Sequence, residues 1–364
     1  MHLGGTTPTN MVSVLPSIKF IFLFLSINVF YGISEDEQTS KRFPLVISTW
    51  PFKMAVEAAW EAVNHGYSAV DAVVEGCSTC EELRCDGTVG PGGSPDEEGE
   101  TTMDALVMSG TTMEVGAVAA MRNVKDGIKA AKLVMQHTMH TILVGEKASI
   151  FAISMGLPGP TNISSSESIE KWKNWKQNNC QPNFRKNVSP ANKCGPYKPP
   201  DNERCIPNLT EKHPNNIGYG NHDTISMAVI NQMGHIAVGT SSNGATFKIP
   251  GRAGDGAIVG SGAYADDDIG GCGATGDGDI MMRFLPCYQV VESMRLGMSP
   301  KDAAEDAILR IVRKFPGFVG AVFAVDKKGV HGGACNGWTF QYSVRTPNQD
   351  HLQIFTVFPS LSYF

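Results

Sequence analysis

The residues that could carry chemistry begin with Asp223 and Thr224, which stand where a long polar stretch ends and an apolar run begins. A threonine hydroxyl can attack the preceding carbonyl, shift the acyl group from nitrogen to oxygen and, after hydrolysis, leave a new N-terminus. The α-amine released in this way has a reference pKa of about 7.7 to 8.0. It can therefore act as general base for its own hydroxyl. The alternative interpretation is a surface loop that simply enters a sheet.

Other patterns that resemble known sites lack the partners they would need. Residues 260–265 (GSGAYA) fit a dinucleotide-binding fingerprint, but no helix follows them. The acidic run 266–268 lacks the twelve-residue loop and terminal Glu of a calcium hand. Cys77 and Cys80 are spaced like half of a zinc site that has no second half. The sequence therefore predicts no metal and no cofactor.

Composition narrows the class of protein. The chain has 364 residues, of which 42% are hydrophobic and 18% charged, which is typical of a folded chain and not of a disordered one. The formal net charge of -6 argues against a nucleic-acid partner, because binding to phosphates needs a basic face. The 39 glycines indicate many tight turns and close backbone approaches.

Apolar spacing predicts the elements that must position this chemistry. Residues 52–76 repeat with a helical period that a His-Gly pair interrupts, which predicts two helices joined by a turn. Residues 122–139 predict a further helix, and Ser299 followed by Pro300 is typical of a helix start. Strand-like runs occur in pairs, at 105–108, 114–118, 224–230, 235–239, 318–325 and 329–334. Such pairs with helices to either side favour a layered α/β sandwich of mostly antiparallel sheets.

A polar stretch separates the two halves of this pattern. Residues from about 158 to 221 are rich in Asn, Pro, Ser, Lys and Glu, which predicts an exposed linker or surface loop. The stretch contains three cysteines and the three N-glycosylation sequons, at Asn162, Asn187 and Asn208.

The N-terminus predicts entry into the secretory pathway. Residues 20–30 form an apolar run, too short for the roughly twenty residues that a membrane span needs. Small residues follow it, so residues 1–34 are typical of a signal peptide. An uncleaved signal anchor is the alternative. After signal removal we expect no membrane association.

Secretion would place the nine cysteines in oxidising conditions. Cys80 and Cys85 could close a small loop, and Cys180 and Cys194 form a second plausible pair. Five cysteines remain, so at least one thiol should be free; their pairing stays open at this point: Cys77, Cys205, Cys272, Cys287 and Cys335.

From about residue 44 to 336 the chain resembles the glycosylasparaginase (aspartylglucosaminidase) family of N-terminal-nucleophile hydrolases, whose siblings are the isoaspartyl peptidases/L-asparaginases. The motifs that carry the resemblance are STWPFK (48–53), CDGTVGPGGSPDEEGETTMDA (85–105), NCQPN (179–183), CGPYKPP (194–200), GNHDTI (220–225), GTSSNG (239–244), PGRAGD (250–255), GAYADD (262–267) and ATGDGDIMMRFLP (274–286). The resemblance implies an α+β fold, a four-layer αββα sandwich. It also implies a backbone cut after Asp223 that gives an α chain (35–223) and a β chain (224–364), assembled as a dimer of αβ heterodimers.

The resemblance further implies a role for each catalytic residue. Thr224 would be the nucleophile, and the Thr275 hydroxyl and the Gly276 amide would form the oxyanion hole. Ser242 stands where relatives usually have a threonine near the nucleophile.

The same resemblance implies a substrate-binding set. Arg252 would pair with the substrate α-carboxylate, and Asp255 would hold its α-ammonium group. Gly278 would help to form the substrate-binding loop, Trp50 would wall the side where a sugar leaves, and Thr88 would support the site.

The substrate expected from the resemblance is a small molecule, N4-(β-N-acetylglucosaminyl)-L-asparagine. The alternative is a β-aspartyl (isoaspartyl) peptide or L-asparagine at the same site, and a non-catalytic secreted glycoprotein is a third hypothesis. The expected location is the lysosome or vacuole, or the extracellular space.

The end of the chain departs from the family. The tail after Asn336 diverges, so Cys335 has no obvious partner there. Ala304 and Ala324 occupy positions where some relatives have a disulfide, so the β chain should depend more on packing.

Overall fold

The computed structural model describes residues 43–200 and 224–359. The expected signal peptide (1–34), Asp223, Cys205 and the sequon at Asn208 lie outside the described residues.

Two sheets form the centre of the fold. The larger has eight strands in the order β12-β11-β1-β5-β6-β2-β3-β4, and the smaller has four in the order β10-β9-β8-β7. Among the strand pairs of these two sheets only β3 with β4 is parallel, which confirms the expected mostly antiparallel sheets. The strands are β1 (Leu45–Thr49), β2 (Met103–Ser109), β3 (Val115–Met121), β4 (Ile142–Val144), β5 (Ile225–Ile230), β6 (Ile236–Ser242), β7 (Ala263–Asp266), β8 (Gly270–Gly276), β9 (Gly320–Asp326), β10 (His331–Asn336), β11 (Phe340–Arg345) and β12 (Gln353–Val357).

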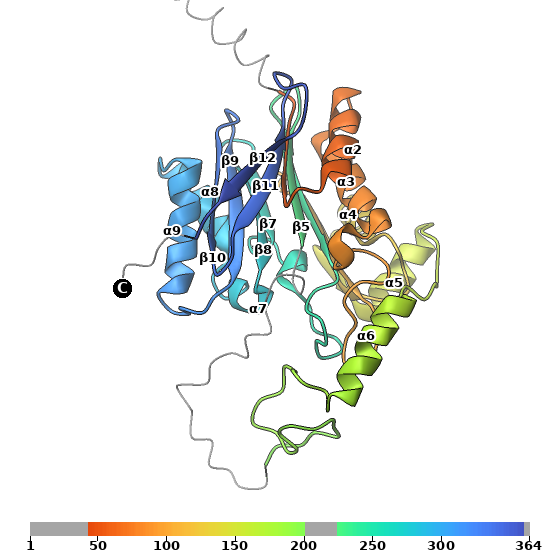
Figure 1. Cartoon of the computed structure of the whole chain (residues 1–364). Coiled ribbons are helices and arrows are strands. Elements are labelled where there is room, and N and C mark those ends of the chain that lie inside the picture. The colour runs from red at the N-terminus through yellow and green to blue at the C-terminus, as the bar shows by residue number, and fades with distance from the viewer. Residues whose placement is uncertain (1–42, 201–223, 360–364) are drawn as a thin grey trace, which may run out of the picture. The chain divides into compact units, whose positions relative to one another are not determined.

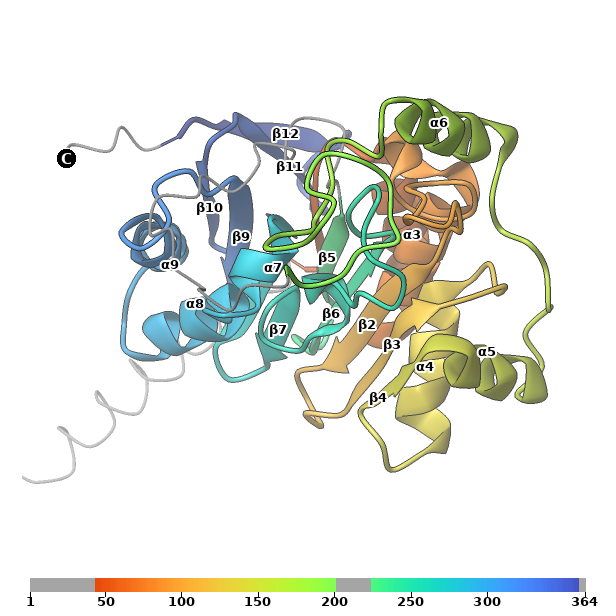
Figure 2. The ribbon, with the colours of Figure 1, turned by 90° about the horizontal axis from the view of Figure 1, so that it is seen from below.

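Helices cover the outer face of each sheet, so the fold has four layers in the order αββα (Figures 1 and 2). The larger sheet is covered by α2 (Lys53–Asn64), α3 (Ala69–Leu83), α4 (Gly127–His137) and α5 (Gly145–Ser154). The smaller sheet is covered by α8 (Pro286–Arg295) and α9 (Pro300–Val312). The predicted fold class is thereby confirmed.

Three apolar clusters fill the spaces between the layers. One lies between the larger sheet and its helices, one between the two sheets, and one between the smaller sheet and α8 and α9. Strands such as β2 and β5 are buried at every position, because each side of the larger sheet faces an apolar layer.

Local sequence explains how the predicted helices begin. The Ser68 hydroxyl accepts a hydrogen bond from the Asp71 amide (3.0 Å) at the start of α3. Ser299 does the same for Asp302 (3.2 Å) at the start of α9, where Pro300 is the first helical residue. Both contacts satisfy an amide that the first helical turn leaves without a partner.

The prediction that the polar stretch is a linker or surface loop was wrong over part of its length, because helix α6 (Ser166–Gln177) lies within it. Ser165 and Ser168 form a reciprocal capping box at its start. Trp175 is buried and stacks on Phe247, with ring centroids 4.8 Å apart. Trp172 also docks the helix, because its indole nitrogen donates to the Glu97 carbonyl (2.9 Å). Docking by these two aromatic side chains leaves no periodic apolar pattern in the sequence.

One further prediction needs correction. The helix expected at 122–139 spans only Gly127–His137. The diverging tail after Asn336 forms β11 and β12, and β11 pairs with β1 in the larger sheet.

Three disulfides cross-link the described residues. Cys80 is joined to Cys85 and Cys180 to Cys194, the two pairs expected from the sequence. A third bond joins Cys272 on β8 to Cys287 on α8, a pairing that the sequence left open. Within the described ranges Cys77 and Cys335 are buried free thiols.

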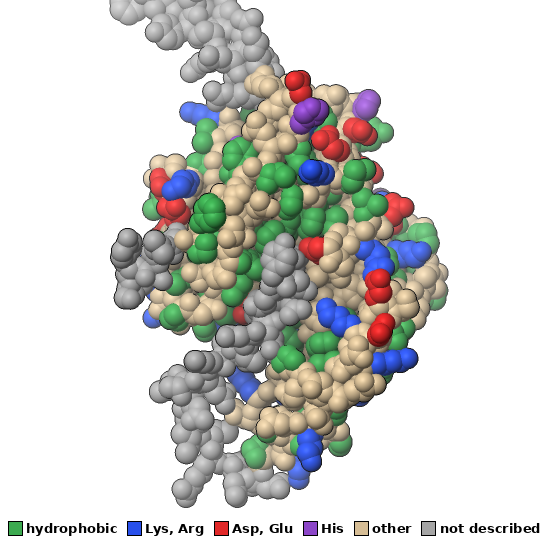
Figure 3. Space-filling view, in the orientation of Figure 1, with side chains coloured by type: hydrophobic (Ala, Val, Ile, Leu, Met, Phe, Trp, Pro, Cys, Tyr) green, Lys and Arg blue, Asp and Glu red, His purple; other side chains and the backbone are tan. Residues whose placement is uncertain are grey.

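On the face seen in Figure 3, acidic and basic side chains are interspersed among the described residues. No helix in residues 43–200 and 224–359 is long and apolar enough to span a membrane.

Candidate active site

Thr224 lies at the N-terminal end of β5, in the middle of the larger sheet. The residue is 4% exposed. The Thr49 hydroxyl donates to the Thr224 carbonyl (2.8 Å) and accepts from the Ser226 amide (2.9 Å). The end of β1 therefore fixes the backbone that directly follows Thr224. Sequence reasoning missed Thr49, although it stands beside Trp50 in the STWPFK motif.

Thr275 lies on the smaller sheet and contacts Thr224. It is fully buried near the end of β8. The Thr224 backbone nitrogen donates to Thr275 Oγ1 over 3.3 Å. The structure thus brings together the predicted nucleophile and one predicted oxyanion-hole residue, at the point where the two sheets face each other.

Gly276 ends β8 with a φ of +134°, a conformation that favours glycine. A Cβ at this position would lie 2.4 Å from the Gly320 Cα on β9. Close packing of β8 against β9 therefore requires glycine here.

Trp50 is held rigidly beside Thr275. Its indole nitrogen donates to Thr275 Oγ1 (3.4 Å), and its ring makes edge contacts with Trp338 (5.2 Å between centroids) and Phe340 (5.5 Å). The Ser343 hydroxyl donates to the Trp50 carbonyl (2.8 Å). The residues that hold Trp50 in place therefore come largely from the diverging tail.

Arg252 and Asp255 lie together in the loop after β6. A Cβ on Gly278 would lie 2.2 Å from Asp255 Oδ1 and 3.1 Å from Arg252 Nη2, so both side chains face the first residue of α7 (Gly278–Met281). Arg252 donates through Nε (3.3 Å) and Nη2 (3.2 Å) to the two carboxylate oxygens of Asp279. This pairing was not predicted.

Asp255 is a buried carboxyl group with an unusual environment. It is buried, and its Oδ2 has no hydrogen-bond partner in the structure. Burial raises the pKa of Asp255 to about 7, although the nearby Arg252 acts in the opposite direction. A buried carboxylate with an unused oxygen is suited to receive a cationic group.

Ser242 and Thr88 hold the turn that follows β6, next to the nucleophile. Ser241 lies opposite Ile225 in the β5–β6 pairing, so Ser242 is one residue further toward Thr224. The Ser242 hydroxyl accepts from the Gly244 amide (2.8 Å). The Thr88 carbonyl accepts from the Asn243 amide (2.9 Å), so Thr88 supports this turn from behind.

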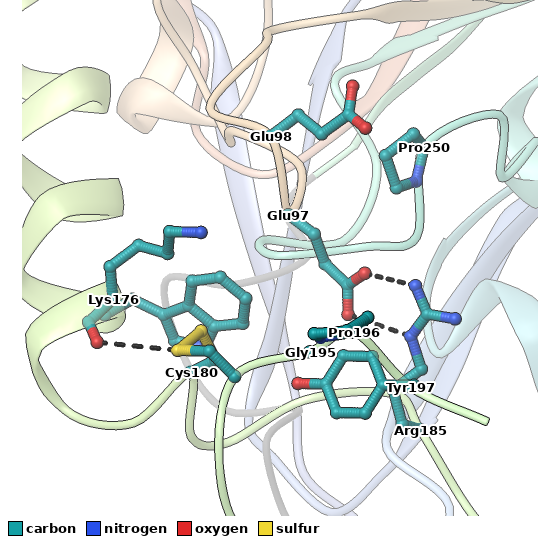
Figure 4. A pocket seen from close by; sticks show the side chains of 11 residues that line it. Glu97, Glu98, Lys176, Cys180, Arg185, Gly195, Pro196, Tyr197 and Pro250 are labelled. Atoms are coloured by element: carbon teal, nitrogen blue, oxygen red, sulfur yellow. Dashed lines mark hydrogen bonds and ion pairs between the residues drawn. A yellow bond between two sulfur atoms is a disulfide. The ribbon is translucent and has the colours of Figure 1, made fainter. Parts of the chain in front are cut away.

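A separate cavity of about 360 Å³ lies beside the docked polar stretch (Figure 4). In it the Arg185 guanidinium pairs with Glu97 (Nε to Oε1 3.2 Å) and lies over the Tyr197 ring. Its lining includes none of the predicted catalytic or substrate-binding residues. In the part of the chain that the structure describes, no cluster of three or more His, Cys, Asp or Glu side chains could hold a metal ion.

The αββα layers, with a threonine at the start of a central strand, are the architecture of the N-terminal-nucleophile hydrolases. The Asparaginase_2 family model, described as asparaginase, matches residues 26–353. The chain belongs to this family of hydrolytic enzymes.

The chain is similar along nearly its whole length to proteins with two different names. The probable isoaspartyl peptidase/L-asparaginase 3 of Arabidopsis thaliana is 67% identical over 357 residues, covering 95% of this chain and 99% of that protein. The N(4)-(beta-N-acetylglucosaminyl)-L-asparaginase of Mus musculus is 50% identical over 316 residues, covering 86% and 90%. Its namesake in Rattus norvegicus is also 50% identical, over 318 residues, covering 86% and 91%.

Proposed function

We propose that the chain cuts itself between Asp223 and Thr224 and then hydrolyses the amide bond of N4-(β-N-acetylglucosaminyl)-L-asparagine. The observation that carries this proposal is the juxtaposition of the Thr224 nitrogen and Thr275 Oγ1, 3.3 Å apart and buried between two sheets. Residues 35–223 would form the α chain and 224–364 the β chain.

In the proposed reaction the freed α-amine of Thr224 takes the proton of its own hydroxyl. The oxygen attacks the side-chain amide carbon, and the Thr275 hydroxyl and Gly276 amide stabilise the developing oxyanion. The amine returns the proton to the leaving nitrogen, and a β-aspartyl ester and the free glycosylamine result. Water then cleaves the ester, which releases aspartate and restores the threonine.

The opposite charges of Arg252 and Asp255 define the accepted head group. A guanidinium binds a carboxylate through two parallel hydrogen bonds, and the unpartnered Oδ2 of Asp255 is free to accept from an ammonium group. An asparagine inside a peptide chain has neither charge. The proposed site therefore takes only substrates whose asparagine or aspartate unit has both a free α-amino group and a free α-carboxylate.

The leaving-group side supports a sugar through Trp50, whose apolar ring is fixed by Trp338 and Phe340. A second candidate, an isoaspartyl peptidase/L-asparaginase, is favoured by the name of the Arabidopsis relative. Both reactions would use the same nucleophile and the same head-group residues.

The ratio of kcat/KM values for glycosylasparagine and for a β-aspartyl dipeptide distinguishes the two. We expect the glycosylated substrate to be preferred by at least about tenfold, the discrimination that one well-fitted apolar contact gives. Trp50→Ala should remove this preference and leave dipeptide hydrolysis less affected. A wild-type preference for the dipeptide would replace the first candidate by the second.

The proposed setting is the secretory pathway, ending in a lysosome or vacuole or outside the cell. Three disulfides among the described residues support oxidising surroundings.

A further inference from the structure

Lys248 is a buried cation that the proposed reaction does not use. It is 1% exposed and is among the largest fully buried side chains of the described residues. Lysine is almost never fully buried unless it is paired. Burial lowers the pKa of Lys248 to about 8, while the nearby carboxylates of Asp104 and Asp96 act in the opposite direction. We therefore expect the buried Lys248 ammonium group to have a specific structural role.

Lys248 closes the turn that follows β6. Its Nζ donates to the Asn243 carbonyl over 2.8 Å. The same turn is held by the Ser242 hydroxyl and by the Thr88 carbonyl described above. Gly244, with a φ of +69°, completes it, and a Cβ there would lie 2.7 Å from Arg252 Nη1. The turn therefore packs directly against the Arg252 guanidinium.

Asp104 lies close to the same guanidinium nitrogen, because a Cβ on Gly244 would lie 3.3 Å from Asp104 Oδ2 and 2.7 Å from Arg252 Nη1. It is 1% exposed on β2, and its Oδ1 accepts from the Ala120 amide (2.7 Å) while its Oδ2 accepts from the Gly254 amide (2.8 Å). Gly254 lies between Arg252 and Asp255, and a Cβ on it would lie 2.7 Å from Arg252 Nη1. Asp104 thus fixes the backbone that links the two head-group residues.

The charges around Arg252 have both signs. Lys248 is a second buried cation near Arg252, and the two like charges repel. The Asp104 carboxylate attracts both cations and offsets this repulsion. In the structure Asp279 pairs with the guanidinium, and in the substrate complex the α-carboxylate would take that place.

We propose that Lys248 and Asp104 are positioning residues that set Arg252 for the substrate α-carboxylate, without touching the substrate themselves. The inference rests on the proposed function, because it assigns a cause to the selectivity of the same site.

The test compares two substrates that differ in one group: the β-anilide of L-aspartate, and the β-anilide of β-alanine, which lacks the α-carboxylate. The variants are Lys248→Met, and Lys132→Met as a matched control on α4. We expect K248M to raise KM for the aspartyl anilide by roughly tenfold with kcat changed by less than about threefold. For the β-alanyl anilide kcat/KM should change by less than about threefold. K132M should match the wild type on both.

Equal losses on both substrates, or a loss confined to kcat, would overturn the inference. Asp104→Asn carries the same comparison if K248M does not fold: its amide oxygen can accept only one of the two backbone hydrogen bonds that Asp104 accepts, from Ala120 and Gly254, so the support of Arg252 is weakened. Failure of the wild-type enzyme to hydrolyse the aspartyl anilide at all would instead overturn the proposed function, and the inference with it.

Discussion

Thr224→Ala is expected to abolish both self-cleavage and substrate hydrolysis. The variant has no hydroxyl to attack the carbonyl of Asp223 and none to attack the substrate. We expect the chain to stay in one piece and kcat to fall by roughly a millionfold, the size of loss found when a catalytic nucleophile is removed. Denaturing gels and a glycosylasparagine assay measure the two effects.

Thr224→Ser is the matched control for this prediction, because it keeps the hydroxyl. It should still cut itself and retain measurable activity. Hydrolysis by Thr224→Ala at the wild-type rate would show that another residue carries the chemistry.

Asp255→Asn has the second largest expected effect. Its carboxylate is buried with one oxygen unpartnered, and the proposed substrate fills that position with an ammonium group. Removing one partner of a buried charge pair costs about 2–5 kcal/mol, so kcat/KM should fall between roughly thirtyfold and several-thousandfold. Asp268→Asn, at an exposed position, is the matched control and should leave kcat/KM unchanged.

The role of Asp255 also predicts how kcat/KM changes with pH. The pKa of Asp255 in the free enzyme is raised to about 7 by burial, so the carboxylate is ionised above that pH and takes up a proton below it. The neutral acid cannot pair with the ammonium group, so kcat/KM falls as the pH drops below about 7. In the wild type both the Thr224 amine and the Asp255 carboxylate take up protons on the acid side, so the fall should become steeper below about 7. Asp255→Asn should show only the shallower, single-proton fall of the Thr224 amine. An unchanged limb in that variant would assign it to another group.

The local part of the fold could be predicted from the sequence. The helices that begin after Ser68 and Ser299 are recognisable by their caps and apolar spacing, because both signals lie within one or two turns. The strand pair at 224–230 and 235–239, which corresponds to β5 and β6, was predicted for the same reason, since only a short turn separates the two runs.

The missed elements depend on distant partners. The region of β7 and β8 is rich in glycine, so its sequence shows little strand propensity. Strand β8 nevertheless needs a residue without a side chain at Gly276, because a Cβ there would clash with Gly320. Strand β1 forms between β11 and β5, which lie far away in the sequence. Neither the tail nor α6 shows locally which surface it will cover.

Some residues of the candidate site were named from the sequence, and others are visible only in the structure. Thr224 was named from its position at the end of a long polar stretch, whereas Arg252 and Asp255 were named through the resemblance to known enzymes. The structure places Arg252 and Asp255 together at Gly278. Thr49, Asp279 and Lys248 were not named, because each acts through a contact that only folding creates. A buried lysine cannot be recognised before its surroundings are known.

Mass spectrometry of the enzyme, after turnover of glycosylasparagine is stopped by acid, tests the central claim most directly. We predict two fragments, the second of which begins at Thr224 and carries one added aspartyl group on that residue. Active protein that consists of a single unbroken chain, or an aspartyl group attached to a different residue, would contradict the proposed mechanism.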